Sequence, residues 1–240
     1  AFWRAATDND RGNGFVFRSA VWSAADRFVR CVKVTARMDE QEISMPPAPE
    51  NNKYNGDETC DRFEISYTYE TPTVPVTEVT VSYLVESDGR IHVQVDYLGK
   101  QGLPELPVLG LRFLMPTAAE GYTYEGLSGE TYPDRMAGGI PGTYRVQGLP
   151  VTPYLVPQDC GMHMQTKWVE ITRKTSLDNT DHAKSESKLR FVAEEGENFA
   201  FTCLPYTAQE LENALHQEEL PPARRTVLSV LGAVRGVGGI

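Results

Sequence analysis

The sequence predicts an all-β protein, a large antiparallel sandwich with one short helix. Apolar and polar residues alternate with a period of two along many short runs, which is typical of strands with one buried face. Glycine and proline residues separate these runs and mark turns. The strand-helix-strand rhythm that builds a parallel sheet is missing from the pattern. Together these observations favour packed antiparallel sheets.

The clearest local prediction is a hairpin. Residues 78–85 and 90–97 alternate strictly, and Asp88-Gly89 lies between them. An Asp-Gly pair between two alternating runs is the strongest short-range signal for a β-hairpin. The residues that we expect to face inward are Val79, Val81, Tyr83, Val85, Ile91, Val93, Val95 and Tyr97.

The other elements follow from the same patterns. Further strands are expected at residues 28–36, 62–69, 109–115, 167–173, 189–193, 199–204 and 226–231. One helix is expected after Thr207, because Thr207 and Glu210 fit a capping box and apolar residues follow at helical spacing. We expect this helix to end near His216, ahead of two prolines. The polar stretches 39–64 and 175–188 are expected to be exposed connections.

Length and charge exclude some classes of protein. A chain of 240 residues fits one domain spanning residues 1–240. A formal net charge of -10 argues against a nucleic-acid partner, because phosphate binding needs clustered Lys and Arg. No run approaches the roughly 18 apolar residues of a membrane span, and no signal-peptide pattern begins the chain. We therefore expect a soluble protein, and its compartment, cytoplasm or periplasm, stays open.

The cysteines do not form a metal motif. Cys31, Cys60, Cys160 and Cys203 are far apart, without a CxxC pair and without a His at zinc-ligand spacing. Free cysteine is among the most buried residue types. Cys203 alternates with Phe199 on one strand face. The sequence thus favours free thiols in the core over metal ligands.

The acidic stretch Asp8-Asn9-Asp10 is the first candidate for a metal site. In a helix-loop-helix calcium loop, the fifth position supplies an oxygen ligand, the sixth is a Gly and the twelfth is a Glu. Counted from Asp8, these positions hold Gly12, Asn13 and Ser19, so the pattern does not match. Short Asp and Asn side chains commonly bind backbone amides in turns. We therefore expect a structural turn here.

Catalytic signatures are also missing. The sequence contains neither a GxSxG nucleophile motif nor a phosphate-binding loop. The four histidines are His92, His163, His182 and His216, and no spacing joins them into a catalytic set. A pair of carboxylates for glycoside chemistry cannot be recognised from sequence, because it is defined by separation in space. No catalytic residue is predicted.

Several ordered motifs nevertheless resemble one family. They are FWRAATDNDRG at 2–12, LPELP at 103–107 with GLR at 110–112, ETYPDR at 130–135, TPY at 152–154 with PQ at 157–158, LPYT at 204–207 with His216, and RGVGG at 235–239. From end to end the chain resembles the β-galactosidase small-chain domain, which is the C-terminal domain of long glycoside hydrolase family 2 β-galactosidases. Ala6 and Cys160 depart from the family's usual Pro and Asn.

The resemblance implies a fold and a role. The fold would be an antiparallel supersandwich akin to galactose mutarotase. In the family the hydrolytic acid and nucleophile are glutamates of a separate TIM-barrel domain, and this domain helps to wall the active-site cleft and supports assembly. The whole enzyme would cleave terminal β-D-galactosides with retention, using two nearby carboxylates. The partners implied are the galactoside substrate and the remaining domains or large subunit.

The resemblance also implies which parts of the enzyme lie outside this domain. It implies that this domain holds no cofactor and that Mg and Na ions are bound by the other domains. The chain ends before a Trp that stacks on the sugar in family members, so we expect a domain taken from a longer chain, inactive alone. The residues that we expect to face the cleft or to hold the motif corners are Arg4, Asp8, Asn9, Asp10, Glu130, Tyr132, Asp134, Arg135 and His216. Two alternatives remain: a stand-alone mutarotase-like aldose epimerase, and a pure subunit-interaction module.

Overall fold

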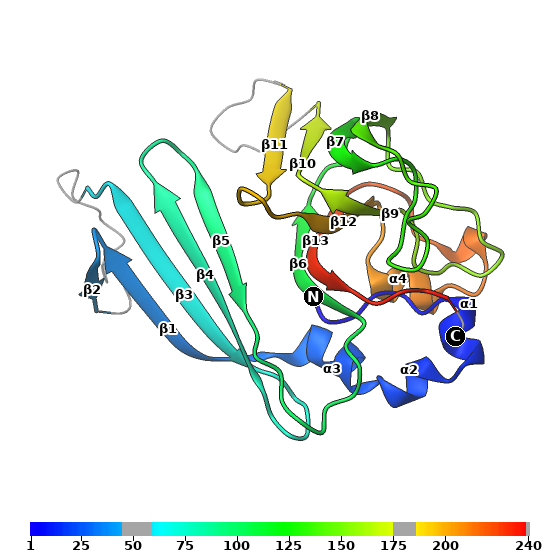
Figure 1. Cartoon of the computed structure of the whole chain (residues 1–240), viewed down its shortest axis with the longest axis horizontal. Helices are drawn as coiled ribbons and strands as arrows, with labels where there is room; N and C mark the ends of the chain where they lie inside the picture. Colours follow the sequence, from blue (N-terminus) through cyan, green and yellow to red (C-terminus); the bar gives the residue numbers. More distant parts are fainter. Residues whose placement is uncertain (45–58, 175–185, 239–240) are drawn as a thin grey trace. The chain divides into compact units, whose positions relative to one another are not determined.

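The computed structural model describes residues 1–44, 59–174 and 186–238 (Figure 1). The chain divides into two compact units: unit 1 comprises Ala1–Trp22 and Glu105–Ile240, and unit 2 comprises Ser23–Pro104. The expectation of one domain over 1–240 stays a prediction. The proline-rich part of the expected 39–64 connection and most of the 175–188 connection lie outside the described residues.

Unit 1 contains two four-stranded antiparallel sheets, which confirms the all-β antiparallel class (Figure 1). One sheet has the order β11-β10-β7-β8, with β7 at Gly121–Leu127, β8 at Pro141–Gln147, β10 at Trp168–Arg173 and β11 at Ser187–Val192. The other has the order β6-β13-β12-β9, with β6 at Val108–Met115, β9 at Met162–Thr166, β12 at Phe199–Leu204 and β13 at Thr226–Val234. Strands β7, β8 and β9 were not expected from the sequence. The likeness to galactose mutarotase stays a prediction.

The core of unit 1 lies between these two sheets. Tyr122 and Tyr124 of β7 and Ile171 of β10 belong to the same buried cluster as Phe201 of β12 and Leu228 of β13. The ring of Phe201 meets those of Tyr122 and Tyr124 edge-on, with centroids 5.6 and 5.3 Å apart, a favourable geometry for aromatic pairs. All six residues of β12 are buried, so this strand is covered on both of its faces.

The expectation of a single helix was wrong among the described residues. The predicted helix is present as α4 (Ala208–Asn213), with Thr207 and Glu210 forming the expected capping box, and a 3-10 turn follows at Gln217–Glu219. Three further helices lie near the N-terminus: α1 (Asp8–Gly12), α2 (Phe15–Arg18) and α3 (Val21–Phe28). Helix α3 therefore includes Phe28, where a strand had been expected to begin.

The turn expected at Asp8-Asn9-Asp10 is the helical turn α1. Thr7 is its N-cap: the hydroxyl of Thr7 accepts a hydrogen bond from the amide of Asp10, and the carboxylate of Asp10 accepts one from the amide of Thr7. This is a capping box with Asp in the place of the usual Glu or Gln. The short acidic side chains thus begin a helix and do not close a loop.

Unit 2 contains one antiparallel sheet with the strand order β2-β1-β3-β4-β5. Its strands are β1 (Arg30–Met38), β2 (Gln41–Ile43), β3 (Arg62–Glu70), β4 (Glu78–Glu86) and β5 (Ile91–Asp96). The predicted hairpin is confirmed: Val81 pairs with Val95, Val85 pairs with Ile91, and Gly89 has a φ of 88° in the turn. Strand β2 lies within the stretch that had been expected to be a connection.

The expected burial of β5 is only partly met. Ile91 and Val93 share a face with Val81 and Val85 of β4, but their exposed fractions are 57% and 42%. Both residues lie on a strand at the edge of the sheet, so they have a neighbouring strand on one side only. The prediction that they face inward is therefore wrong for this structure.

The cysteine prediction is half confirmed. All four thiols are free, and Cys160 and Cys203 are buried in unit 1. Cys31 is exposed and Cys60 is half-buried, so neither is a core residue. Cys31 is the second residue of β1 and lies opposite Tyr69, near the end of the strand.

Candidate functional site

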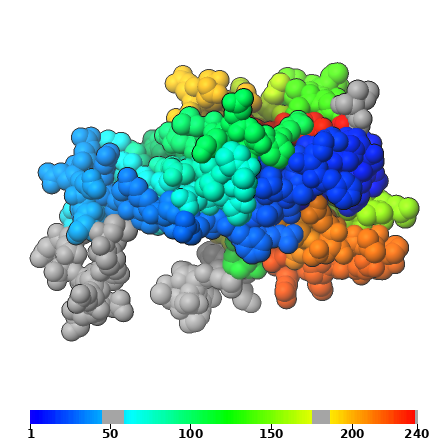
Figure 2. All heavy atoms as spheres, turned by 90° about the horizontal axis from the view of Figure 1, so that it is seen from below, coloured from blue at the N-terminus to red at the C-terminus, as the bar shows by residue number. Residues whose placement is uncertain are grey.

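The N-terminal segment and α4 cover the outer face of sheet β6-β13-β12-β9 in unit 1. The carboxylate of Glu212 in α4 accepts hydrogen bonds from the indole N–H of Trp3 and from the amide of Ala6, both 2.9 Å long. Arg112 of β6 donates to the carbonyl of Trp3 at 2.7 Å. Figure 2 shows the N-terminal residues (dark blue) beside the segment around α4 (orange). The single side chain of Glu212 therefore holds both Trp3 and Ala6 of the opening motif against α4.

A buried ion pair lies in the covering layer. Arg4 donates to both carboxylate oxygens of Asp10, at 2.6 and 3.3 Å, and the two side chains are only 4% and 1% exposed. This two-point contact fixes the guanidinium and the carboxylate in one plane. Burial would raise the pKa of Asp10, but the hydrogen bonds and charge of Arg4, together with the bonds from Thr7, hold it below its ordinary value. Asp10 is therefore a buried carboxylate with its charge compensated.

The same pair contacts the C-terminal tail, residues 235–238. Arg4 donates to the carbonyl of Gly236 at 3.3 Å, although 232 positions separate them. The side-chain amide of Asn9 donates to the carbonyl of Val237 at 2.9 Å. Arg235 lies 3.4 Å from Asp10 and stacks on the ring of Phe15. The opening motif and the tail thus form one polar cluster.

Asp134 of the ETYPDR motif holds the tail from another direction. Its carboxylate accepts a hydrogen bond from the amide of Val237 at 2.9 Å. A Cβ atom at Gly236 would lie 2.6 Å from one carboxylate oxygen of Asp134, and a Cβ atom at Gly238 would lie 2.7 Å from the other. Burial raises the pKa of Asp134, but amide hydrogen bonds from Val237 and Gly238 outweigh it and hold the pKa below its ordinary value. We call Arg4, Asn9, Asp10, Asp134 and residues 235–238 the terminal network.

Glu130 and Tyr132 of the same motif hold a neighbouring loop. Glu130 accepts hydrogen bonds from the amide of Gly161 at 2.7 Å and from the hydroxyl of Thr152 at 2.8 Å. The buried hydroxyl of Tyr132 donates to Asp159 at 2.9 Å. Burial raises the pKa of Asp159 to about 6, against the attraction of Arg4 and the hydrogen bond from Tyr132. Asp159 thus links this loop electrostatically to the terminal network.

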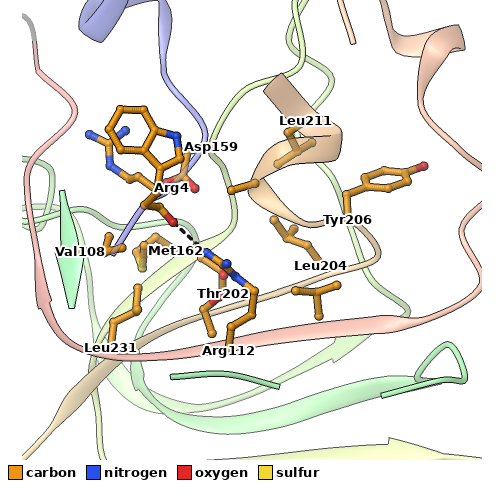
Figure 3. A pocket seen from close by; sticks show the side chains of 14 residues that line it. Arg4, Val108, Arg112, Asp159, Met162, Thr202, Leu204, Tyr206, Leu211 and Leu231 are labelled. Carbon is orange, nitrogen blue, oxygen red and sulfur yellow. Dashed lines mark hydrogen bonds between the residues drawn. The ribbon is translucent and has the colours of Figure 1, made fainter. Parts of the chain in front are cut away.

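A cavity of about 30 Å³ lies between the covering layer and the sheet (Figure 3). Arg4 of the covering layer and Asp159 of the loop before β9 line it, and Thr202 and Ser229 line it from β12 and β13. Pockets that bind small molecules usually measure about 300 to 1,000 Å³, whereas about 30 Å³ is one water's share of the liquid. The cavity can therefore hold water but is too small for a hexose.

A wider hollow of about 330 Å³ lies on the sheet of unit 2. Its lining residues are Arg37, Glu40, Arg62, Glu64 and Leu84. Charged side chains of both signs line this hollow, and the set contains no aromatic ring on which a sugar could stack. The geometry does not single it out as a saccharide site.

The histidines are placed differently from one another. His216 is exposed and lies 3.2 Å from Glu219, away from the terminal network. His92 is exposed on unit 2 and lies 3.1 Å from Glu86. His163 is buried and contacts the hydroxyl of Tyr122 and the carbonyl of Gly129. His182 lies outside the described residues. Both described His-carboxylate pairs lie on the surface, outside the enclosed kind of pocket that acid-base catalysis uses.

The structure therefore brings together most of the predicted site residues. Arg4, Asn9, Asp10 and Asp134 meet at the tail, and Tyr132 is connected to them through Asp159. Asp8 lies nearby, with its amide bound to the side chain of Gln158 at 2.8 Å. Arg135 is exposed beside Tyr154. His216 does not join this group.

Sequence reasoning missed four members of the arrangement. They are Asp159, Glu212, Arg235 and Arg112. Arg112 and Arg235 stood inside recognised motifs, and Asp159 directly follows one. Glu212 carried no signal except its place in a predicted helix, because its partners are more than 200 positions away.

Among residues 1–44, 59–174 and 186–238, no group of three or more His, Cys, Asp or Glu side chains is arranged to hold a metal ion. Over the same residues, no helix is long and apolar enough to cross a membrane.

Comparison with known proteins gives a consistent family. The model of the family described as "Beta galactosidase small chain" matches residues 1–240. A "Beta-galactosidase small subunit" of Latilactobacillus sakei is 60% identical over 100% of this chain and 75% of that protein. "Beta-galactosidase BgaC" of Bifidobacterium adolescentis and a "Beta-galactosidase" of Streptococcus thermophilus are each 32% identical. They match over 99% and 100% of this chain, which spans 20% of each of them.

Proposed function

The chain belongs to the β-galactosidase small-chain family, and from that membership we propose that it is the small-chain component of a β-galactosidase. The observation that carries the proposal is the extent of the match. It runs through the whole of residues 1–240, yet the chain spans only a fifth of the long relatives. The proposed component therefore works together with a larger partner, either a separate large subunit or further domains of one polypeptide.

We propose that this component does not hydrolyse galactosides alone. Three motif carboxylates of unit 1 are occupied with structural partners: Asp10 with Arg4, Asp134 with the tail, Glu130 with Gly161. The cavity beside Arg4 is too small for a sugar. A retaining mechanism needs two carboxyl groups about 5 Å apart across a bound glycoside. In this proposal the partner supplies both, and it also supplies the Mg and Na ions.

The role proposed for this chain is to complete the galactoside cleft of the assembled enzyme and to support assembly. Arg4, Asp10 and Tyr132 are buried, so their part is to hold the motif corners. The candidates left for direct contact with sugar or partner are the exposed members of the set. They are Asp8, Asn9, Glu130, Asp134, Arg135 and His216.

Binding to the partner tests the component role. The purified chain, mixed with the large subunit that accompanies the L. sakei small subunit, is expected to elute with it in gel filtration. A chain with Arg4 replaced by Ala serves as a control with a disrupted covering layer and should bind more weakly. Separate elution of the unaltered chain at micromolar concentrations of both proteins would contradict the proposal.

A second assay separates this role from the epimerase alternative. The chain alone should interconvert the anomers of galactose no faster than buffer, as followed by polarimetry. A rate above buffer that disappears when the chain is heat-denatured would favour a stand-alone epimerase.

A further inference from the structure

A polar row crosses the outer face of sheet β6-β13-β12-β9, beneath the covering layer. Arg112, Ser229 and Thr202 lie opposite one another on β6, β13 and β12. Opposite residues of an antiparallel pair point to the same face of the sheet. Two buried hydroxyls in the middle of a packed face destabilise it unless they are hydrogen-bonded. The pairs on either side of this row are apolar: Leu231 with Ala200, and Val227 with Leu204.

Both hydroxyls are buried without a protein partner. Thr202 and Ser229 are 7% and 8% exposed. Within residues 1–44, 59–174 and 186–238, no hydrogen bond from a backbone or side-chain group reaches either hydroxyl. Both residues line the cavity of about 30 Å³ between the covering layer and the sheet. That cavity is the place from which a partner can reach them.

The opposite side of this cavity carries buried charged residues whose hydrogen bonds are also incomplete (Figure 3). Nε of Arg4 has no hydrogen-bond partner among the described residues. Tyr132 donates to one oxygen of Asp159, and the second oxygen accepts no bond from that part of the chain. One buried donor and one buried acceptor therefore lie across the cavity from two hydroxyls, each of which can donate and accept.

We propose that this cavity binds ordered water, which joins Arg4 and Asp159 on one side to Thr202 and Ser229 on the other. Its volume of about 30 Å³ exceeds the roughly 10 to 15 Å³ that one water needs. Nearly all of its lining residues are buried, so the water is held inside the protein. A buried water commonly makes about three hydrogen bonds, and these four residues supply enough donors and acceptors for them.

The charges around the cavity favour a neutral ligand. Arg4 and Arg112 line it, and their positive charges repel a cation. Asp159 lines it too, and burial raises the pKa of this residue to about 6. At pH 7.5 Asp159 is therefore a carboxylate, which repels an anion. Water carries no charge and both donates and accepts hydrogen bonds, so it suits all four groups.

The bound water connects the covering layer to the sheet. One direct polar contact between the N-terminal segment and this sheet is the bond from Arg112 to the carbonyl of Trp3. The water adds a connection at Arg4, whose other nitrogens bind Asp10. This inference concerns the stability of unit 1 and does not depend on the proposed activity, because an inactive chain could still hold the water.

Replacement of one hydroxyl tests the site through the sign of its effect. Thr202→Val exchanges the hydroxyl for a methyl group of nearly the same size. If water binds the hydroxyl, the substitution removes a hydrogen bond, and we expect the urea midpoint of unfolding to fall by about 0.4 M. If the hydroxyl is unpaired in a dry cavity, the methyl group is the more favourable of the two and the midpoint rises.

The matched control is Thr143→Val on β8, an exposed position whose hydroxyl is in bulk water. It should change the midpoint by less than half as much as Thr202→Val. An unchanged or higher midpoint for Thr202→Val would overturn the proposal, and so would a fall no larger than that of the control.

A crystal structure of the unsubstituted chain at high resolution gives a readout that needs no variant. We expect density for an ordered oxygen within about 3.2 Å of both Asp159 and Thr202. A cavity without ordered density would overturn the proposal. Crystals soaked in bromide separate water from an anion, because bromide scatters anomalously. We expect no anomalous peak in the cavity, and a peak there would identify an anion site and overturn the assignment to water.

Discussion

Carboxylates of unit 1 bind backbone amides that are distant in sequence. Asp134 accepts from Val237, Glu130 from Gly161, and Glu212 from Ala6. A buried or half-buried amide that lost its acceptor would cost about 1 to 3 kcal/mol. The acidic residues of the motifs therefore have a structural role that is visible without any substrate.

Gly236 provides a direct test of the terminal network. A Cβ atom added here would lie 2.6 Å from Asp134, and movement of that carboxylate would break its bond to Val237. We expect Gly236→Ala to lower the free energy of unfolding by about 1 to 3 kcal/mol in urea titrations. The control is Gly232→Ala, where a Cβ atom would meet nothing within 4 Å. Equal effects of the two substitutions would contradict the role of Asp134.

His163 has a pH dependence that the structure fixes in direction. Burial lowers its pKa to about 4, although the hydrogen bond to Gly129 opposes this. As pH falls from about 6.5 to 4, the unfolded chain takes up a proton that the folded chain refuses, so this residue removes stability over that range. Its effect can reach about 1.4 kcal/mol for each pH unit.

An NMR titration of the imidazole ring measures this residue alone. It is needed because Asp159, with its pKa raised to about 6, changes stability in the opposite direction between about pH 4 and 6. We expect the His163 ring to titrate with a midpoint near pH 4, so that its signals are those of a neutral imidazole at pH 6. A midpoint near 6.5 in the folded chain would show that the ring is not buried as described.

The strands illustrate what alternation can and cannot reveal. Residues 78–97 were predictable because a period-two pattern and an Asp-Gly turn agree. Strand β7 was missed because Gly121 and Gly126 interrupt its pattern, and β8 because it begins with Pro141-Gly142. These strands form through pairing with β10 and with each other, and a single sequence does not show that pairing.

The N-terminal helices were missed for a different reason. Helices α1 and α2 have five and four residues, too short for a helical period to be recognised. The cap at Thr7 begins α1, and both helices contact the tail, α1 through Asn9 and α2 through Phe15. The only available signal was Thr7 with Asp10, a capping box in which Asp replaces Glu.

The N-terminal cap of α4 can be tested by substitution. Thr207 accepts a hydrogen bond from the amide of Glu210. We expect Thr207→Ala to lower the free energy of unfolding by about 1 kcal/mol, since that is the usual value of such a cap. Thr207→Ser keeps the hydroxyl and should lose less than half as much. If Ser and Ala are equally destabilising in urea titrations, the lost methyl group matters and the cap does not.

At the scale of the whole chain, unit 1 is assembled from two separate stretches of sequence. Residues 1–22 and 105–240 form it together, and residues 23–104 form unit 2 between them. The contact of Arg4 with Gly236 closes this arrangement across 232 positions. Local patterns predicted the strands, and ordered motifs indicated the family, but the terminal network depends on pairs of residues that no spacing rule connects.

The candidate site could be predicted only in part, because its contacts join residues from both ends of the chain. The resemblance named Arg4, Asp10 and Asp134 as motif residues without saying what they contact. The structure places all three at the tail and shows Arg4 and Asp10 to be buried. His216 was named on equal terms, yet it lies apart from them on the surface.

Reconstitution of hydrolysis tests directly whether this chain is a component of a β-galactosidase. Hydrolysis of o-nitrophenyl galactoside is measured for this chain alone, for the large subunit that accompanies the L. sakei small subunit, and for their mixture. We predict no turnover above buffer by the chain alone, and turnover in the mixture that exceeds that of the large subunit alone. Turnover by the chain alone, or a large subunit whose full activity the chain does not change, would contradict the proposal that this chain is a small-chain component.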